Sequence, residues 1–250
     1  MTGIRRRDLL TGTALVLVGE KLARAEIITG KLPWHPDAGS PPSPVQFSGW
    51  KYFTAAEAAT VEALVDRIIP PDPQTPGGKD AGCAVFIDRQ LAGGYGRQEG
   101  LYRQGPFQKG AKQQGPQSAQ GPADLYRAAL AALDHYSRTN NIPTGSGHEG
   151  QHFSELTTGR QDEVLRGMEG GALKLEGVDA QSFFEQLLKD TQQGFFADPI
   201  YGGNRDMCAW KMIGFPGARY DYRDWVRRHN ERYPLPPVGI GGAPEWTPKS

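Results

Sequence analysis

The sequence predicts an all-α fold, an irregular small helical bundle with long Gly/Pro-rich loops and extended arms. Five segments repeat apolar residues at the three- and four-residue spacing of amphipathic helices, whereas no run of alternating β-branched residues occurs. The 250 residues include 33 glycines and 20 prolines, and only 38% are hydrophobic. This composition indicates long irregular segments around a modest core.

The first predicted helix has the clearest start and stop signals in the chain. Thr54 is followed three residues later by Glu57, which is the pattern of a capping box. Pro70 and Pro71 end the helix. Its apolar stripe consists of Val61, Leu64, Val65, Ile68 and Ile69.

Four further helices follow along the chain. We expect one at about 81–91, one at 122–136 that begins with a proline, one after Thr157 or Thr158, and one capped by Asp179. The side chains expected to face the core are Leu125, Tyr126, Leu130, Leu133, Val164, Leu165, Met168, Phe183, Phe184, Leu187, Leu188 and Phe195.

Residues 1–25 have the pattern of an export signal rather than part of the fold. A basic stretch that includes Arg6 and Arg7 precedes a weakly apolar run at 9–18, and small residues at Ala23 and Ala25 offer a cleavage site. Ten apolar residues are too few to span a bilayer, which needs about 20. The paired arginines indicate a twin-arginine (Tat) signal, so we expect the protein in the bacterial periplasm.

The charge balance argues against nucleic-acid binding. The chain has 28 Lys and Arg against 28 Asp and Glu, so its formal charge is zero. Without residues 1–25, the balance becomes 23 against 26. A clustered basic surface for phosphates is therefore not expected.

The chain divides into four segments, one of which contains an insertion. The export signal at 1–25 is followed by a Pro-rich arm at 26–49, a helical domain at 50–233 and a Pro/Gly-rich tail at 234–250. A Gly/Gln-rich insertion at 93–122 interrupts the domain and holds eight Gly and seven Gln.

Two interpretations of this insertion stay open. It is a flexible, solvated loop, or it is an arm laid over a partner. In the second case its anchors are Tyr95, Leu101, Tyr102 and Phe107.

Motifs for chemistry within the chain are scarce. No strand precedes the glycines at 93–96, so they do not form a dinucleotide-binding motif, and no C-x-x-C-H or G-x-S-x-G occurs. His148-Glu149-x-x-His152 satisfies the zinc string H-E-x-x-H. Surrounding glycines disfavour the helix that the string needs, and a third ligand is not evident. Two loop histidines are the simpler interpretation, and a zinc hydrolase is the alternative.

The most distinctive stretch runs from 194 to 218. Asp198-Pro199 and Gly202-Gly203 demand turns. We expect Asp206 to cap a short helix that contains Trp210 and Ile213. Gly214 and Pro216 should end this helix. We also expect Arg205 to form an ion pair with Asp198 or Asp206. The stretch is either a rigid turn that closes the core or a contact surface, because aromatic residues are enriched in interfaces.

This stretch resembles the gluconate 2-dehydrogenase subunit 3 family. The resemblance spans about 50–220 and also includes Phe53-Thr54, Ile68-Ile69-Pro70 and Phe86-Ile87-Asp88. The motif residues, which are candidates for a partner interface, are Asp198, Pro199, Tyr201, Gly202, Gly203, Asn204, Arg205, Asp206, Trp210, Gly214, Phe215 and Pro216.

The resemblance implies a small, non-catalytic subunit of a membrane-associated sugar or sugar-acid dehydrogenase. Its large partner would be an FAD protein of the glucose-methanol-choline type, and a multihaem cytochrome c would often supply haem c in a third subunit. The small subunit would stabilise the large one and escort it through its own Tat signal, and membrane association would come only through partners. No catalytic, metal-binding or cofactor-binding residue of this chain is implied.

Cys83 and Cys208 are the only cysteines. They are too few for a disulfide-rich scaffold, but an oxidising compartment permits a bridge between them. Three outcomes stay open: an internal disulfide, a bridge from one cysteine to a partner, or two buried thiols.

Overall fold

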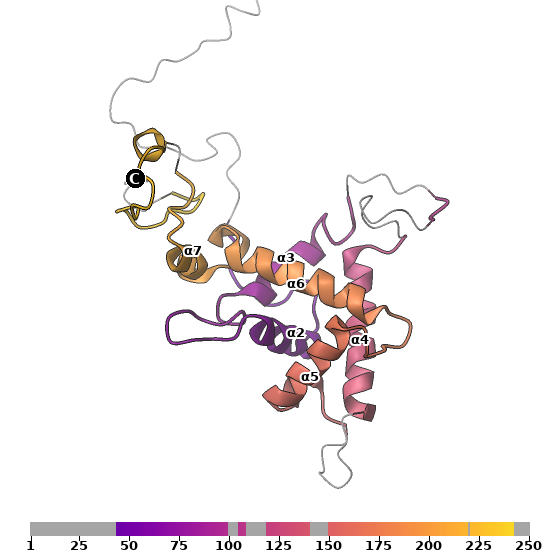
Figure 1. Cartoon of the computed structure of the whole chain (residues 1–250). Coiled ribbons are helices and arrows are strands. Elements are labelled where there is room, and N and C mark those ends of the chain that lie inside the picture. The colour runs from indigo at the N-terminus through magenta and orange to yellow at the C-terminus, as the bar shows by residue number, and fades with distance from the viewer. Residues whose placement is uncertain (1–43, 100–104, 109–118, 141–149, 220, 243–250) are drawn as a thin grey trace, which may run out of the picture. The chain divides into compact units, whose positions relative to one another are not determined.

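The computed structural model describes residues 44–242 except 100–104, 109–118, 141–149 and 220 (Figure 1). The described part of the chain is helical and contains no strand, which confirms the all-α prediction. Its α-helices are α2 (Ala55–Ile68), α3 (Cys83–Ala92), α4 (Pro122–Asn140), α5 (Thr158–Glu169), α6 (Ala180–Phe196) and α7 (Cys208–Ile213). Short 3₁₀ turns are η2 (Phe153–Glu155), η3 (Pro199–Tyr201), η4 (Arg205–Met207) and η5 (Arg223–Trp225).

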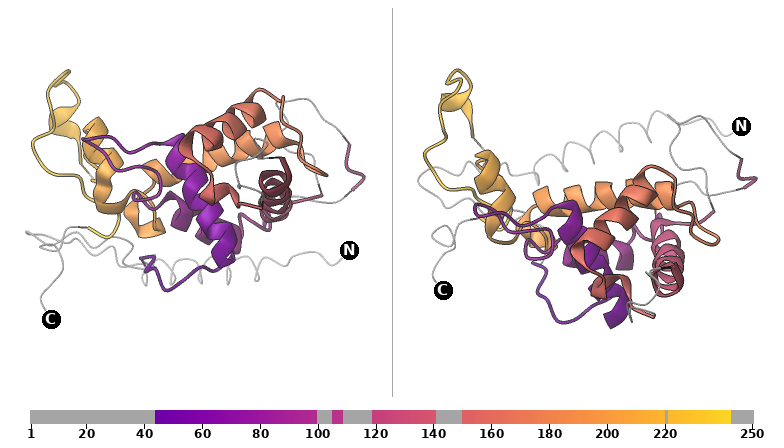
Figure 2. Two further views of the ribbon diagram at one scale, coloured as in Figure 1. Left: turned by 90° about the horizontal axis from the view of Figure 1, so that it is seen from below. Right: turned by 60° about the horizontal axis from the view of Figure 1, so that its bottom comes forward.

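Helix α6 is the central element. It contacts α2, α3, α4, α5 and α7, and both views in Figure 2 show the other helices gathered around it. Asp179 caps its start as predicted, because the carboxylate accepts the backbone N–H groups of Gln181 (3.1 Å) and Ser182 (3.2 Å).

The predicted capping box at the start of α2 is present. The Thr54 hydroxyl accepts the N–H of Glu57 (3.3 Å), and the Glu57 carboxylate accepts the N–H of Thr54 (2.8 Å). Two otherwise unpaired donors are satisfied, so the helix start is fixed by local sequence.

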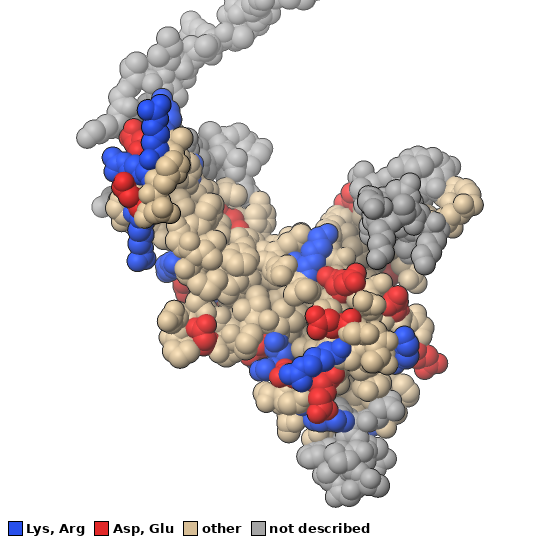
Figure 3. All heavy atoms as spheres, viewed as in Figure 1, with Lys and Arg blue, Asp and Glu red and all other residues tan. Residues whose placement is uncertain are grey.

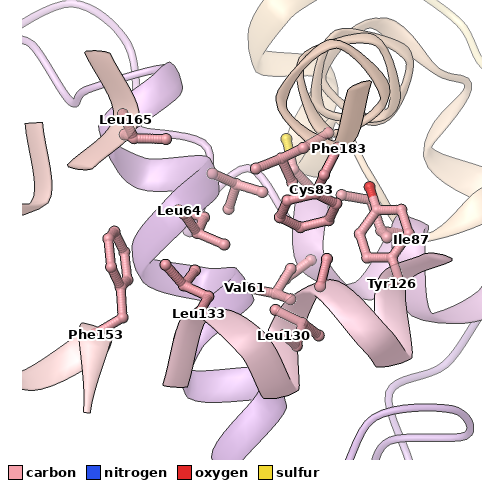
Figure 4. Close-up of a cluster of buried hydrophobic side chains, with 14 of the residues drawn as sticks. Val61, Leu64, Cys83, Ile87, Tyr126, Leu130, Leu133, Phe153, Leu165 and Phe183 are labelled. Atoms are coloured by element: carbon pink, nitrogen blue, oxygen red, sulfur yellow. The ribbon is translucent and has the colours of Figure 1, made fainter. Parts of the chain in front are cut away.

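The apolar stripes of the helices meet in one core (Figure 4). Tyr126 of α4 and Phe183 of α6 are both fully buried, and their rings lie edge to face with centroids 5.4 Å apart. Other members drawn in Figure 4 are Val61, Leu64, Cys83, Ile87, Leu130, Leu133, Phe153 and Leu165. The stripes predicted for α2, α4, α5 and α6 all contribute buried residues to this core.

A buried carboxylate links the start of the Gly/Gln-rich insertion to α6. Asp190 accepts the hydroxyl groups of Tyr95 and Tyr126 (2.9 Å each) and the side-chain amide of Gln186 (2.8 Å). Burial raises the pKa of Asp190, although these three donors act in the opposite direction. Tyr95 therefore holds the chain just after α3 against the central helix.

A second buried carboxylate attaches the segment before α2 to α3. Asp88 accepts the backbone N–H groups of Lys51, Tyr52 and Phe53, at 2.9, 2.9 and 3.0 Å, and pairs with Arg89. The Phe86-Ile87-Asp88 segment thus positions the entry to α2.

The structure extends one predicted helix and leaves some predictions outside the described residues. Helix α4 continues to Asn140 rather than ending near Tyr136. Arg6, Arg7, the rest of the export signal and most of the Pro-rich arm lie outside the described residues. No helix in the described ranges is both long enough and apolar enough to cross a membrane.

Candidate partner interface

The chain between α6 and α7 folds into two tight turns, η3 and η4. Asp198 caps η3, because its carboxylate accepts the N–H of Ile200 (3.0 Å). The same carboxylate accepts the N–H of Ile240 (2.6 Å), and the carbonyl of Ile200 accepts the N–H of Val45 (2.8 Å). The turn therefore bonds to one segment that precedes the helices in the sequence and to one that follows them.

Gly203 is required for close packing. A Cβ there would lie 2.1 Å from the carbonyl oxygen of Gly194 in α6, closer than any side chain tolerates. Gly202 has a φ of +94°, in the left-handed region, and its carbonyl faces Gly82 at the start of α3. The paired glycines thus let the turn lie directly on α6 and α3.

Asn204 is the buried centre of the turn. Its side chain is fully buried, donates to the carbonyl of Ala197 (2.9 Å) and accepts the N–H of Ala209 (2.9 Å). Its φ of +45° is a conformation that asparagine adopts more readily than most residues. One side chain thus connects the end of α6 to the start of α7.

Two predictions about this turn are wrong. Asp206 does not cap α7; it lies within η4 at φ +53°, and Met207 precedes the helix at φ +55°. Because both residues are left-handed, the chain reverses here and Asn204 supplies the acceptor for Ala209 instead. In the described chain Arg205 forms no ion pair with Asp198 or Asp206, and its side chain lies over Gly82.

Helix α7 is fixed by an aromatic side chain. Trp210 is 6% exposed, and its indole N–H donates to the carbonyl of Phe196 (2.9 Å). Phe215 lies edge to face against Trp210 with centroids 5.1 Å apart. Gly214, with a φ of +71°, ends α7 as predicted. Pro216, two residues after Gly214, leads into the segment that follows.

Exposed apolar side chains occur at the end of α6, in η3, on α7 and directly after α7. We call this set the α7 surface; its members are Phe196 (42% exposed), Tyr201 (40%), Met212 (49%), Ile213 (57%) and Phe215 (42%). In Figure 3, uncharged side chains cover much of the area over α7, whereas both charge signs are scattered over α4 to α6. Exposed large apolar side chains in one part of a protein are typical of binding sites.

The twelve motif residues divide into three groups by burial. Asp198, Gly203, Asn204 and Trp210 are buried and hold the turn together. Pro199, Gly202 and Pro216 are partly exposed. The exposed residues, which are available for contact, are Tyr201, Arg205, Asp206, Gly214 and Phe215.

Three members of the α7 surface, Phe196, Met212 and Ile213, lie within the predicted stretch 194–218 but are not among the predicted candidates for the interface. A sequence signal for Met212 and Ile213 does exist. They are adjacent apolar residues on a helix of only six residues, which is too short to bury both side chains.

The zinc string is only partly within the described residues. His148 and Glu149 lie outside them. The Nδ1 atom of His152 lies 2.5 Å from a carboxylate oxygen of Asp134 in α4. Within the described ranges, no three His, Cys, Asp or Glu side chains gather as a metal site requires.

The two cysteines are unbonded thiols in the structure. Cys83 is fully buried at the start of α3, and Cys208 is half-buried at the start of α7. Burial raises the pKa of Cys83 to about 12, and the neighbouring Cys208 contributes to this shift.

The sequence matches a profile of the family described as gluconate 2-dehydrogenase subunit 3 over residues 55–217. No curated protein and no solved structure gives a match. The matched range begins with α2 and ends at Gly217, so it includes all six described helices and the turn between α6 and α7. The chain therefore belongs to the gluconate 2-dehydrogenase subunit 3 family, whose name denotes a subunit of an oxidoreductase complex.

Proposed function

We propose that this chain is the non-catalytic small subunit of a periplasmic sugar or sugar-acid dehydrogenase similar to gluconate 2-dehydrogenase. Its partner is the FAD-containing large subunit, of the glucose-methanol-choline type, and a multihaem cytochrome c completes the complex where one is present. The chain binds the large subunit through the α7 surface. Family membership supports the role as a subunit, and the α7 surface supports binding of a protein partner.

One observation carries the proposed binding mode. Met212 and Ile213 are about half exposed, at 49% and 57%, on a helix that buried hydrogen bonds hold in place. A rigid element with exposed aliphatic and aromatic side chains loses little conformational entropy on binding and gains the hydrophobic free energy of the buried area. Such a surface suits stable association between subunits.

The proposed escort role depends on the export signal. A flavoprotein folds around FAD in the cytoplasm, and the twin-arginine route carries folded proteins. A large subunit without a signal of its own would then leave the cytoplasm bound to this chain. The pair Arg6 and Arg7 supports this part of the proposal.

The test is to co-express both subunits and to replace Arg6 and Arg7 together with Lys. Periplasmic dehydrogenase activity should fall to background while cytoplasmic FAD-loaded large subunit accumulates. The matched control is Lys21→Arg, a conservative change of a basic residue elsewhere in the signal. Unchanged periplasmic activity in the double variant would mean that the large subunit exports itself.

Metal analysis of the purified chain separates this function from the zinc hydrolase. The proposed function predicts no stoichiometric zinc, flavin or haem in the small subunit alone. Zinc at one equivalent, lost together with a hydrolytic activity in the His148→Ala variant, would contradict the proposal.

A further inference from the structure

The segment from Lys211 to Val238 differs in charge from the rest of the chain, and we call it the basic segment. It carries six Lys and Arg against three Asp and Glu, whereas residues 26–210 carry 16 against 22. In Figure 3, blue side chains gather at the upper left, over the part of the chain that follows α7. A local positive charge on an otherwise acidic protein favours an acidic partner at this place.

The basic segment folds back onto itself. The N–H of Ala218 donates to the carbonyl of Val238 (2.6 Å), and the N–H of Val238 donates to the carbonyl of Pro216 (3.3 Å). A Cβ on Gly217 would lie 2.1 Å from the Val238 carbonyl oxygen, so the backbone at Gly217 is in direct contact with the backbone at Val238. Val238 is buried, and this contact holds the start and end of the segment together.

Aromatic rings stiffen the loop between these ends. Tyr233 lies against Trp225 with the two rings tilted by 58° and their centroids 4.9 Å apart, and it lies edge to face with Tyr222 at 6.2 Å. The Arg219 guanidinium lies 5.1 Å from the centre of the Tyr233 ring and donates to the carbonyl of Pro236 (2.5 Å). The segment therefore presents a shaped surface rather than an open coil.

Two hollows lie between residues 210–216, which include the end of α7, and the later part of the basic segment. One, of about 420 Å³, is lined by the aromatic and proline side chains of Trp210, Phe215, Tyr233 and Pro236. The other, of about 650 Å³, is lined on its apolar side by Met212, Ile213, Tyr222 and Trp225. Both hollows are of a size that takes several side chains.

Cationic side chains border both hollows. Lys211 and Arg232 line each of them, and in the described chain neither has a carboxylate within ion-pair distance. Arg228 and Glu231 also line the larger hollow and form an ion pair at 3.9 Å, and the Arg228 guanidinium lies 4.6 Å from the Trp225 ring centre. The carboxylate of Glu231 offsets Arg228, so among the described residues the unpaired positive charge there comes from Lys211 and Arg232. Exposed apolar side chains flank them, with Val226 at 68% and Leu235 at 53% exposure.

We propose that this surface binds an extended acidic segment of the partner subunit, with apolar side chains in the hollows and carboxylates on Lys211 and Arg232. The proposal rests on the proposed function, since it specifies which part of the large subunit lies against the basic segment and the adjoining members of the α7 surface. An anionic bilayer shares the charge preference, but it presents a flat surface that leaves two concave hollows unfilled. An extended chain fills hollows and pairs with cations at the same time.

Zero-length crosslinking with a carbodiimide tests the contact in the purified complex. Lys211 is the only lysine of the basic segment, so a crosslink there identifies the carboxylate that it meets. We expect mass spectrometry to find Lys211 joined to an Asp or Glu of the large subunit. Lys174, which is exposed between α5 and α6, serves as the control and should form no such crosslink.

Charge reversal tests how much Lys211 and Arg232 contribute to the binding free energy. The K211E/R232E double variant should bind the large subunit about tenfold more weakly at about 0.05 M salt. The difference should shrink at about 0.5 M salt because exposed charges are screened. The K174E/K189E double variant changes the net charge equally at two exposed sites on other elements and should bind like the wild type.

The outcomes distinguish this proposal from the proposed function. If the wild type binds the large subunit but K211E/R232E binds equally well and Lys211 forms no crosslink, this proposal is wrong and the proposed function stands. If the wild type binds no flavoprotein subunit, the proposed function fails and this proposal with it. Flotation of the wild type, but not of K211E/R232E, on phosphatidylglycerol vesicles, together with unchanged subunit binding, would make the surface a membrane contact and overturn the proposal.

Discussion

Gly203 lies with its backbone directly against the carbonyl of Gly194 in α6, where a Cβ would approach the oxygen to 2.1 Å. The turn between α6 and α7 is therefore supported by the central helix itself. Because α7 follows within a few residues, this contact sets the position of the α7 surface.

The Gly203→Ala variant should lose about 3 kcal/mol of unfolding free energy, because a methyl group cannot be accommodated against backbone. Gly214→Ala is the matched control. Its φ of +71° strains alanine, but nothing lies within 4 Å of the added Cβ. We expect a loss of about 1 kcal/mol there, measured by urea denaturation. Equal losses in the two variants would contradict the backbone contact.

Asn204→Ala should lower the unfolding free energy by about 3 kcal/mol, because the part-buried carbonyl of Ala197 and the buried N–H of Ala209 each lose their partner. Asn204→Gly removes the same bonds but tolerates the φ of +45°, so it should be about 1 kcal/mol less destabilising. Urea denaturation of both variants measures the difference. A loss below about 0.5 kcal/mol in both would show that the side chain does not hold the turn.

Asp190 should make the stability of the protein depend on pH. Burial raises its pKa above the ordinary value of 3.8, so the folded chain holds this proton more tightly than the unfolded chain does. Its contribution is complete below the unfolded pKa and is lost as the pH rises through the folded pKa. The unfolding free energy of the wild type relative to Asp190→Asn should therefore increase as the pH falls through this window.

Asp162 provides a control of opposite sign. The hydrogen bond from Arg67 lowers the pKa of Asp162, so its contribution is present above the unfolded pKa and is lost as the pH falls through the folded pKa. Asp162→Asn should thus approach the wild type at low pH. Urea titrations at several pH values measure both differences, and parallel trends for the two variants would refute the assignment.

The thiols should differ in reactivity. Cys83 is fully buried and its pKa is raised to about 12, so almost none of it is thiolate at neutral pH. An aromatic disulfide reagent should label Cys208 first and Cys83 only after denaturation, giving two thiols per chain without reductant. One thiol or none would indicate a bridge. A band at the summed mass of two subunits that collapses on reduction would place a cysteine in the interface.

Local signals in the sequence account for most of the fold. Capping residues lie next to the helices that they start, so they can be recognised in the sequence. The capping box of Thr54 and Glu57 starts α2, and Asp179 starts α6, both where predicted. The turn before α7 was not predicted in detail because one of its bonds joins distant residues and because several of its residues adopt left-handed backbone angles. Asp198 bonds Ile240, 42 residues away, and Asn204 replaces Asp206 as the acceptor for α7. Which motif residues are exposed depends on this tertiary arrangement.

Hydrogen–deuterium exchange of the small subunit, alone and bound to the FAD-containing large subunit, tests the central claim most directly. The account predicts that binding slows exchange of the backbone amides of α7 and of residues 214–218. Ile213→Asp should abolish this protection and weaken binding about tenfold, whereas Ala131→Asp, at an exposed position of α4, should do neither. The claim that the α7 surface binds the large subunit would be contradicted if the complex forms without any change of exchange in α7 and the Ile213→Asp variant binds like the wild type.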